Sequence, residues 1–229
     1  MIPLRDVNPS STTPFVTRAI IAVNVVVFVQ EILLGPGPCA PCSASVRRSG
    51  TSPQLIMNDL RPGPAAALTL VTSMFIHGGW MHLIGNMWYL WIFGDNVEDR
   101  FGHVGYLLFY LAAGMVAGVV QYATNPASTL PTVGASGAIA GVLGAYAVAY
   151  PTARVVTLVP IFFFIQIMAL PALVVLGLWF VLQFFSGALT LAASVSGGVA
   201  FWAHVGGFAF GALAMLLAGA RARGSAPQF

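Results

Sequence analysis

The sequence predicts an all-α membrane protein, folded as one bundle of six transmembrane helices. Hydrophobic residues make up 58% of the 229 residues and charged residues only 7%, far below the roughly 25% charged fraction of a soluble domain. Apolar runs of about 20 residues, long enough to cross a bilayer as helices, account for most of the chain. These observations leave little sequence for a separate soluble domain.

Prolines and glycines mark the ends of the expected spans. The first span ends at Gly35-Pro36-Gly37-Pro38, because two prolines stop a helix. We interpret it as an uncleaved helix rather than a signal peptide, since no clear small-residue cleavage site follows. His77-Gly78-Gly79 interrupt the second apolar stretch, so its helix is expected to start near Trp80, after an interfacial segment at 68–76.

The second half of the chain divides in the same way. Pro151 stops the fourth span, and Pro160 and Pro171 split the long run 155–185 into a short segment and a fifth span. The last span ends before two arginines. The six expected spans are 18–34, 80–93, 104–122, 133–150, 170–185 and 200–220.

The distribution of charge orients these spans. The segments 123–133 and 187–200 carry no charge, whereas Arg5, Arg18, Arg100, Arg154, Arg221 and Arg223 lie near the termini and in short loops. The positive-inside rule then gives a cytoplasmic segment 1–17, a six-helix domain 18–220 with a long external loop 35–67, and a cytoplasmic tail 221–229. Three arginines do not fit the positive-inside rule, because they lie in the loop assigned to the outside: Arg47, Arg48 and Arg61. Charges within a long loop have less influence on orientation.

The net charge of +3 is too small and too dispersed for a nucleic-acid surface. The partner expected from composition is therefore the lipid bilayer. The small size favours a bacterial protein of the plasma membrane. The sequence carries no indication of oligomeric state.

Four polar side chains interrupt the apolar runs: His82, Asn86, Ser136 and His204. Burying such a group without partners costs roughly 2–7 kcal/mol, so polar groups at membrane depth tend to face each other or a wet cavity. All four fall within the first two turns of spans that run from outside to inside, so we expect one cluster at the outer end of the bundle. Asp95, Glu98 and Asp99 lie at the opposite end.

A serine, two histidines and an asparagine suit acyl transfer. Ser136 opens a helix after Gly134, where free backbone N–H groups favour a developing oxyanion. His82 and Asn86, four residues apart, share one helical face and could donate to the same oxygen. Because the acidic residues lie at the other end, His204 and Ser136 are expected to form a dyad without a carboxylate.

Glycines on the fourth and sixth spans would let those two helices approach closely. They are Gly137, Gly141, Gly144, Gly207 and Gly211. Taken singly, each polar residue is better explained as a packing or interhelical hydrogen-bonding group. Their occurrence at one depth on three co-oriented helices favours catalysis. A channel or transporter is a weaker alternative, because the polar groups do not continue through the membrane and no inverted repeat is evident.

These motifs resemble the rhomboid intramembrane serine proteases over roughly residues 70–211. His82-Leu83-Ile84-Gly85-Asn86 is similar to the family's oxyanion pair, Gly134-Ala135-Ser136-Gly137 to its nucleophile motif, and Ala203-His204-Val205-Gly206-Gly207 to its general-base helix. The resemblance implies a six-helix rhomboid-like bundle with a water-filled cavity, whose substrates are transmembrane segments of other proteins. Ser136 and His204 would be catalytic, and His82 and Asn86 would bind the oxyanion. A catalytically silent relative that escorts transmembrane clients is the alternative.

The resemblance implies no cofactor and no metal, and the chain has no His-Glu-x-x-His motif. Where the family often has an aromatic residue one turn after the nucleophile, this chain has Ala140, so we expect a nearby Phe or Trp to support His204. Cys39 and Cys42 in the external loop are interpreted as a loop disulfide or free thiols rather than a redox pair. His77 is expected at the wet interface, with a loop-holding role as the alternative.

Overall fold

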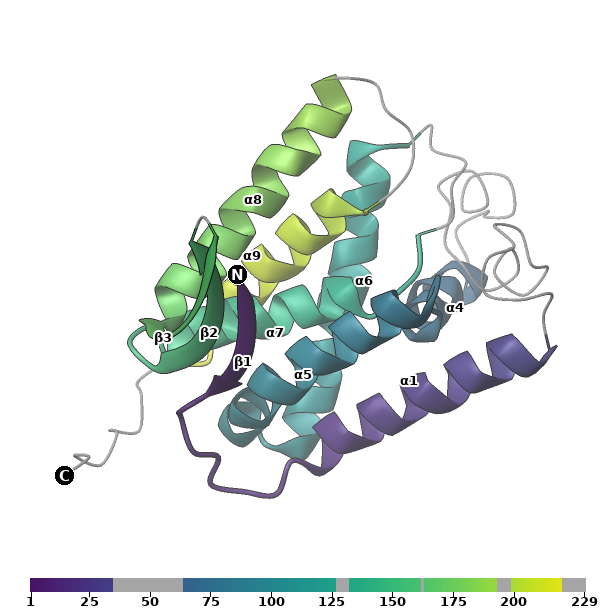
Figure 1. The fold of residues 1–229 in the computed structure, drawn as a ribbon. Helices are drawn as coiled ribbons and strands as arrows, with labels where there is room; N and C mark the ends of the chain where they lie inside the picture. The colour runs from purple at the N-terminus through teal and green to yellow at the C-terminus, as the bar shows by residue number, and fades with distance from the viewer. Residues whose placement is uncertain (35–63, 127–131, 162, 193–198, 220–229) are drawn as a thin grey trace.

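The protein is described here from a computed structural model that covers residues 1–34, 64–126, 132–161, 163–192 and 199–219. Long helices make up most of it, and a small sheet lies beside them (Figure 1). The helices are α1 (Phe15–Leu34), α4 (Pro64–Thr72), α5 (Trp80–Phe101), α6 (His103–Thr124), α7 (Ser136–Ala149), α8 (Ala172–Ala192) and α9 (Phe201–Leu217), with a 3₁₀ turn η1 at Ser73–Phe75. The strands are β1 (Ile2–Asp6), β2 (Arg154–Ile161) and β3 (Phe164–Pro171).

Six of these helices coincide with the six expected spans. Helix α5 begins at Trp80, as the glycines before it predicted, and α9 begins within one residue of the expected start. In the described residues, α1, α6 and α8 are long and apolar enough to cross a membrane, while α7 and α9 are shorter apolar helices. The expected count of six spans is therefore not confirmed by length and composition alone.

The structure is mostly helical, as predicted, but it is not all-α, because β1, β2 and β3 form an antiparallel sheet in that order. A short segment followed by the start of a span was expected after residue 154, but 154–161 and 164–171 pair as two antiparallel strands in which Pro160 lies opposite Ile165. The run is rich in β-branched and aromatic residues, which favour strands. Its prolines were interpreted only as helix breaks, whereas proline is also tolerated at the edge of a sheet, as in the edge strand β3 and at Pro160, beyond the residues of β2 that pair with β1.

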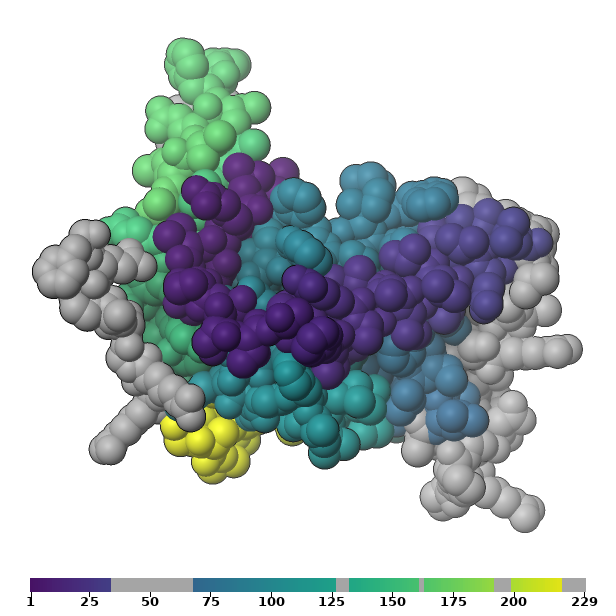
Figure 2. Space-filling view, turned by 90° about the horizontal axis from the view of Figure 1, so that it is seen from below, coloured from purple at the N-terminus to yellow at the C-terminus, as the bar shows by residue number. Residues whose placement is uncertain are grey.

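The first strand ties the N-terminal segment to the helices. β1 pairs with β2, the Trp88 indole N–H donates to the Pro3 carbonyl at 2.7 Å, and the Tyr146 hydroxyl donates to the Asp6 carboxylate at 2.8 Å. Viewed from below, the N-terminal residues spread across the surface of the molecule (Figure 2). The segment expected to precede the bundle is thus an ordered part of it.

The acidic residues at the end of α5 hold the start of α1. The Glu98 carboxylate accepts hydrogen bonds from the backbone N–H groups of Val16 and Thr17 at 2.9 and 2.8 Å, and from the Thr17 hydroxyl at 2.7 Å. His103 lies 2.6 Å from the same carboxylate. Asp99 accepts from Ser11 and Thr12. A carboxylate at a helix N-terminus satisfies free N–H groups and the helix dipole, so this acidic cluster is structural.

Helix α7 lies at the centre of the bundle. Twelve of its 14 residues are buried. A Cβ atom on Gly144 would meet α9, whereas one on Gly137 or Gly141 would first meet an alanine of α6. A methyl group on Gly144 or Gly207 would overlap the backbone carbonyl of Phe208 or Gly137. The two helices therefore touch through their backbones, which confirms the expected close approach and brings their first turns together.

Candidate active site

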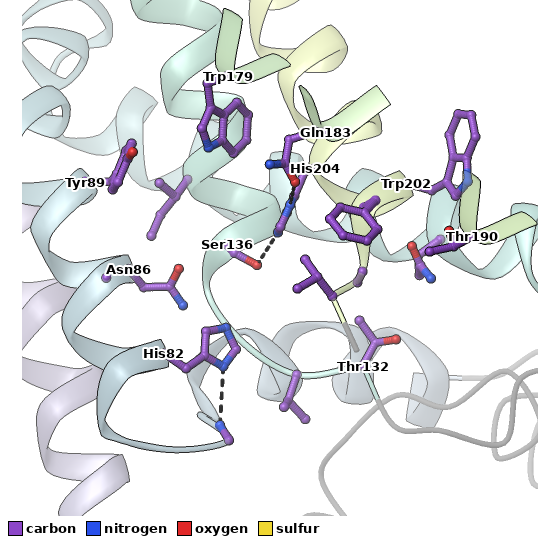
Figure 3. A pocket seen from close by; sticks show the side chains of 18 of the residues that line it. His82, Asn86, Tyr89, Thr132, Ser136, Trp179, Gln183, Thr190, Trp202 and His204 are labelled. Atoms are coloured by element: carbon purple, nitrogen blue, oxygen red, sulfur yellow. Dashed lines mark hydrogen bonds between the residues drawn. The ribbon is translucent and has the colours of Figure 1, made fainter. Parts of the chain in front are cut away.

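The four polar residues predicted to form a site line one cavity of about 730 Å³. Their side chains come from three helices: His82 and Asn86 from α5, Ser136 from α7 and His204 from α9 (Figure 3). The cavity lies at the opposite end of α5 from Glu98 and Asp99. The cluster is thus separated from these two carboxylates, as predicted.

Ser136 and His204 are in direct contact. The Ser136 hydroxyl oxygen lies 2.8 Å from Nε2 of His204, within hydrogen-bond distance (Figure 3). Ser136 is the first residue of α7, where backbone N–H groups lack partners inside the helix. His204 is buried, with 8% of its surface exposed. Close contact between α7 and α9 places the two side chains together.

Gly134 makes room for the ring of His82. Its φ is +115°, and a Cβ atom there would lie 2.6 Å from Cε1 and 2.7 Å from Nε2 of the ring. Only glycine combines this backbone conformation with so close an approach. At the far side of the ring, the Gly78 N–H donates to Nδ1 at 3.4 Å. A neutral ring that accepts at Nδ1 carries its proton on Nε2, which faces the loop before Ser136.

Asn86 lies one turn after His82 on the same face of α5. It is buried, and its Nδ2 group has no hydrogen-bond partner among the described residues. Figure 3 shows its side chain directed across the cavity toward Ser136. A buried amide without a partner normally costs free energy. An unoccupied donor here suits a site whose acceptor arrives with the substrate.

His77 does not lie at a wet interface, so that expectation was wrong. The residue is 4% exposed, and its ring packs 5.2 Å from the ring of His82 and 6.5 Å from that of Phe28. Burial, with a smaller contribution from neighbouring His82, lowers the pKa of His77 to about 4. Its backbone N–H donates to the Glu31 carboxylate at 3.3 Å. His77 thus packs behind His82, which is closer to the loop-holding alternative.

Two cavity residues on α8 were not identified from the sequence. Oε1 of Gln183 lies 2.7 Å from Nδ1 of His204, and the rings of Trp179 and His204 are 5.7 Å apart between centroids. Trp179 fulfils the expectation that a nearby aromatic residue contacts His204 in place of Ala140. The two residues are spaced four apart, the same signal that singled out His82 and Asn86, so this pattern could have revealed them.

A third residue missed by the sequence analysis holds the start of α9. The Gln121 side-chain oxygen accepts a hydrogen bond from the backbone N–H of Ala203 at 3.1 Å. The same N–H also donates to the Ala200 carbonyl at 3.1 Å, so Gln121 adds a second acceptor at the N-terminus of the helix that carries His204. In the described part of the chain, no group of three or more His, Cys, Asp or Glu residues could hold a metal ion. Cys39 and Cys42 lie outside the described residues.

Comparison with known proteins identifies several similar chains. The chain is 33% identical over 150 residues to presenilin-associated rhomboid-like protein A, mitochondrial, from Danio rerio, an alignment that covers 63% of this chain and 36% of the relative. It is 42% identical over 71 residues to rhomboid-like protein 11, chloroplastic, from Arabidopsis thaliana, covering 31% and 25%. Rhomboid protease GluP of Bacillus subtilis is 42% identical over 76 residues, covering 33% and 14%.

The chain spans about a third or less of the length of these relatives. The prediction of a bacterial plasma membrane is contradicted by this comparison and is wrong. The finding that overturns it is that relatives from Danio rerio and Mus musculus are named as mitochondrial and one from Arabidopsis thaliana as chloroplastic.

The family comparison covers more of the chain than any of these pairwise alignments. The Rhomboid domain family matches residues 64–221, a range that includes all four residues of the predicted site and the two helices that carry Ser136 and His204. The chain belongs to the rhomboid family.

Proposed function

We propose that this protein is an intramembrane serine endopeptidase that cleaves transmembrane segments of other membrane proteins. The contact of 2.8 Å between the Ser136 hydroxyl and Nε2 of His204 carries this proposal. A serine paired with a histidine inside a cavity is the arrangement of an activated nucleophile. The name of the relative rhomboid protease GluP supports the same activity.

In the proposed reaction, Nε2 of His204 takes the hydroxyl proton as the oxygen of Ser136 bonds to the scissile carbonyl carbon. The carbonyl oxygen gains negative charge. His204 then gives its proton to the leaving amine as the carbon–nitrogen bond breaks, leaving an acyl group on Ser136. A water molecule attacks this ester with His204 again as base, which releases the carboxylic acid and restores the serine.

The charged oxygen would be bound by three donors: the Ser136 backbone N–H, the Nε2–H of His82 and the amide of Asn86. Two observations support this assignment. Asn86 Nδ2 is buried without a partner among the described residues, and Gly78 binds the His82 nitrogen that must remain free of a proton. Preorganised donors in a site shielded from bulk water stabilise the transition state strongly.

The proposed membrane arrangement keeps α1, α5, α6, α7, α8 and α9 as six spans within a protease domain of residues 18–220. Helices α7 and α9, of 14 and 17 residues, are about 21 and 26 Å long at 1.5 Å per residue, less than the roughly 30 Å hydrocarbon core. A short, almost wholly buried α7 would place Ser136 below the membrane surface. The mitochondrial and chloroplastic relatives support an organellar membrane.

A catalytically silent protein that escorts transmembrane clients is the competing function. Such a protein needs the helices and the cavity but has no need of an aligned Ser136 and His204. The contact between them favours the enzyme.

The test is cleavage of a helix-destabilised transmembrane substrate by the purified chain, compared with Ser136→Ala and His204→Ala. Each substitution should abolish cleavage, while helix content by circular dichroism and the unfolding temperature stay close to wild type, because each shortened side chain faces the cavity. Cleavage by Ser136→Ala at the wild-type rate would refute the dyad. Binding of the substrate without cleavage by the wild type would favour the escort function.

A further inference from the structure

His204 is held on its second nitrogen by a helix that carries neither member of the dyad. Nδ1 of His204 lies 2.7 Å from the side-chain oxygen of Gln183 on α8. An amide oxygen only accepts hydrogen bonds, so the Nδ1–H of His204 is the donor. A neutral imidazole carries one proton. With that proton on Nδ1, Nε2 has a free lone pair and can accept the proton of the Ser136 hydroxyl.

Trp179 restrains the plane of the same ring. It lies one turn before Gln183 on α8, and its ring is inclined by 37° to that of His204. Trp179 also packs on Phe208, one turn further along α9, at 6.2 Å between ring centroids. Helix α8 therefore contacts His204 on one nitrogen and on one face of the ring.

Helix α7 gives the histidine no comparable support. One turn after Ser136, it has Ala140, whose methyl group lies within 3.4 Å of the position that a Cβ atom on Gly207 would take. Ala140 thus belongs to the glycine contact between α7 and α9. That contact places the backbone of α9, but it leaves the tautomer and the orientation of the His204 ring to other groups.

We propose that Gln183 is a positioning residue for the dyad: it fixes His204 in the tautomer that accepts a proton from Ser136, while Trp179 restrains the ring plane. The proposal rests on the proposed function. Gln183 takes the place that a carboxylate holds in a three-residue catalytic unit, with a neutral group whose burial costs less than that of a charge.

The first test compares substitutions that keep or remove the acceptor. Gln183→Leu, similar in size, removes the oxygen and should lower kcat about 10- to 100-fold, a part of the 10²–10⁴ that a general base contributes. KM should change less than about twofold, because Gln183 acts through His204. The rate at which a fluorophosphonate probe labels Ser136 should fall by the same factor as kcat, since this reaction also needs the base but no peptide substrate.

The second test uses Gln183→Glu. If Gln183 had only a structural role, the pH profile of this variant would match that of wild type. Once ionised, the carboxylate accepts from Nδ1–H, so this variant should regain most of the labelling rate. The activity of the Glu variant should rise with pH as the carboxyl ionises, and wild type should lack this rise. Gly177→Ala is the control, because Gly177 is on the same helix but outside the described lining of the cavity, and a Cβ atom there would meet no described atom within 4 Å. It should behave as wild type.

The outcomes separate the two proposals. If Gln183→Leu labels and cleaves at the wild-type rate, or if the folded Glu variant stays as slow as the Leu variant at every pH, the positioning role is refuted while the dyad stands. If wild type is folded yet neither labels nor cleaves, both proposals fall. If Gln183→Leu fails to fold, the pH profiles of Gln183→Glu and wild type still test the positioning role. The role is refuted if the activity of the Glu variant shows no rise with pH beyond that of wild type.

Discussion

Gly211 of α9 lies directly against the backbone carbonyl of Gly141 on α7, so that a methyl group on Gly211 would overlap the carbonyl oxygen. The same contact recurs one turn earlier, between Gly207 and the carbonyl of Gly137. At both points the nearest atom is a backbone carbonyl oxygen rather than part of a flexible side chain. The distance between the helices, and with it the distance between Ser136 and His204, is therefore set by glycine.

We predict that Gly211→Ala lowers both stability and activity. Overpacking a core typically costs 1–3 kcal/mol, and because the obstacle here is backbone, we expect a cost of about 3 kcal/mol. Pushing α9 away from α7 also lengthens the contact between His204 and Ser136, so cleavage should fall more than tenfold even at temperatures where the variant is folded. Thermal unfolding in detergent and the cleavage rate measure the two effects.

Gly177→Ala is the matched control for this substitution. Gly177 is in α8, and a Cβ atom there would meet no atom of the described residues within 4 Å. Alanine is the better helix former by up to about 1 kcal/mol, so this variant should be as stable as wild type or slightly more stable, with unchanged cleavage. Equal behaviour of the two alanine variants would show that the contact between α7 and α9 is not close enough to control the site.

The sequence predicted the elements whose signals are local. The glycines before Trp80 marked the start of α5. Four polar residues in apolar runs identified the cavity, because such groups at membrane depth tend to face each other or a wet cavity. The hairpin of β2 and β3 was missed because its prolines were interpreted as helix breaks, and β1 was missed because its pairing joins Ile2 to Leu158 across most of the chain. A pairing of such long sequence separation leaves little local signal beyond the β-branched residues of the hairpin.

Gln183 and His77 were missed or misplaced for a related reason. A glutamine in an apolar helix indicates that some partner exists, but whether it is His204, a backbone carbonyl or water depends on how α8 is rotated against α9. His77 stands next to two glycines, a pattern typical of exposed turns. Its burial follows from Phe28 and His82, which pack on it from α1 and α5.

A second prediction separates the oxyanion donors from the dyad. Asn86→Ala should lower kcat by about 10²–10³ with little change in KM, because the donor is used only when charge develops on the carbonyl oxygen. Residual activity should remain, unlike in Ser136→Ala. His82→Ala should behave in the same way, and the double variant should be less than multiplicatively worse, since both donors serve one oxygen.

Steady-state kinetics of the three variants at one pH measure these effects, with circular dichroism to confirm folding. Asn86→Asp is an informative companion, because it keeps the size of the side chain but replaces the donor with an acceptor that repels an oxyanion. It should be at least as slow as Asn86→Ala. Wild-type kcat in Asn86→Ala would assign the asparagine to packing alone and leave Ser136 and His204 as the whole catalytic unit.

A third prediction concerns Asp6 in β1, at the opposite end of the molecule from the cavity. Desolvation raises the pKa of Asp6 from 3.8 to about 6, and the neighbouring Asp95 adds to this rise, while the hydrogen bond from the Tyr146 hydroxyl opposes it. Between about pH 4 and pH 6 the folded protein therefore binds a proton at Asp6 that the unfolded chain has lost. The contribution of Asp6 to stability is fully present below pH 4 and is lost as the pH rises through 6.

Asp6→Asn removes this titration and keeps an oxygen that can accept from Tyr146. A pKa difference of this size corresponds to about 3 kcal/mol in the free energy of unfolding. Because Asp6 is only half-buried, solvent screening reduces the expected effect to about 1–2 kcal/mol. Relative to wild type, the Asn variant should therefore become more stable by about 1–2 kcal/mol between pH 4 and pH 7, or roughly 2–8 °C in Tm. Tyr146→Phe, which removes the donor that favours the charged carboxylate, should enlarge the pH dependence seen in wild type. A difference between Asp6→Asn and wild type that stays constant across this range would show that Asp6 has the same pKa in the folded and unfolded chain, and that β1 docks without desolvating its carboxylate.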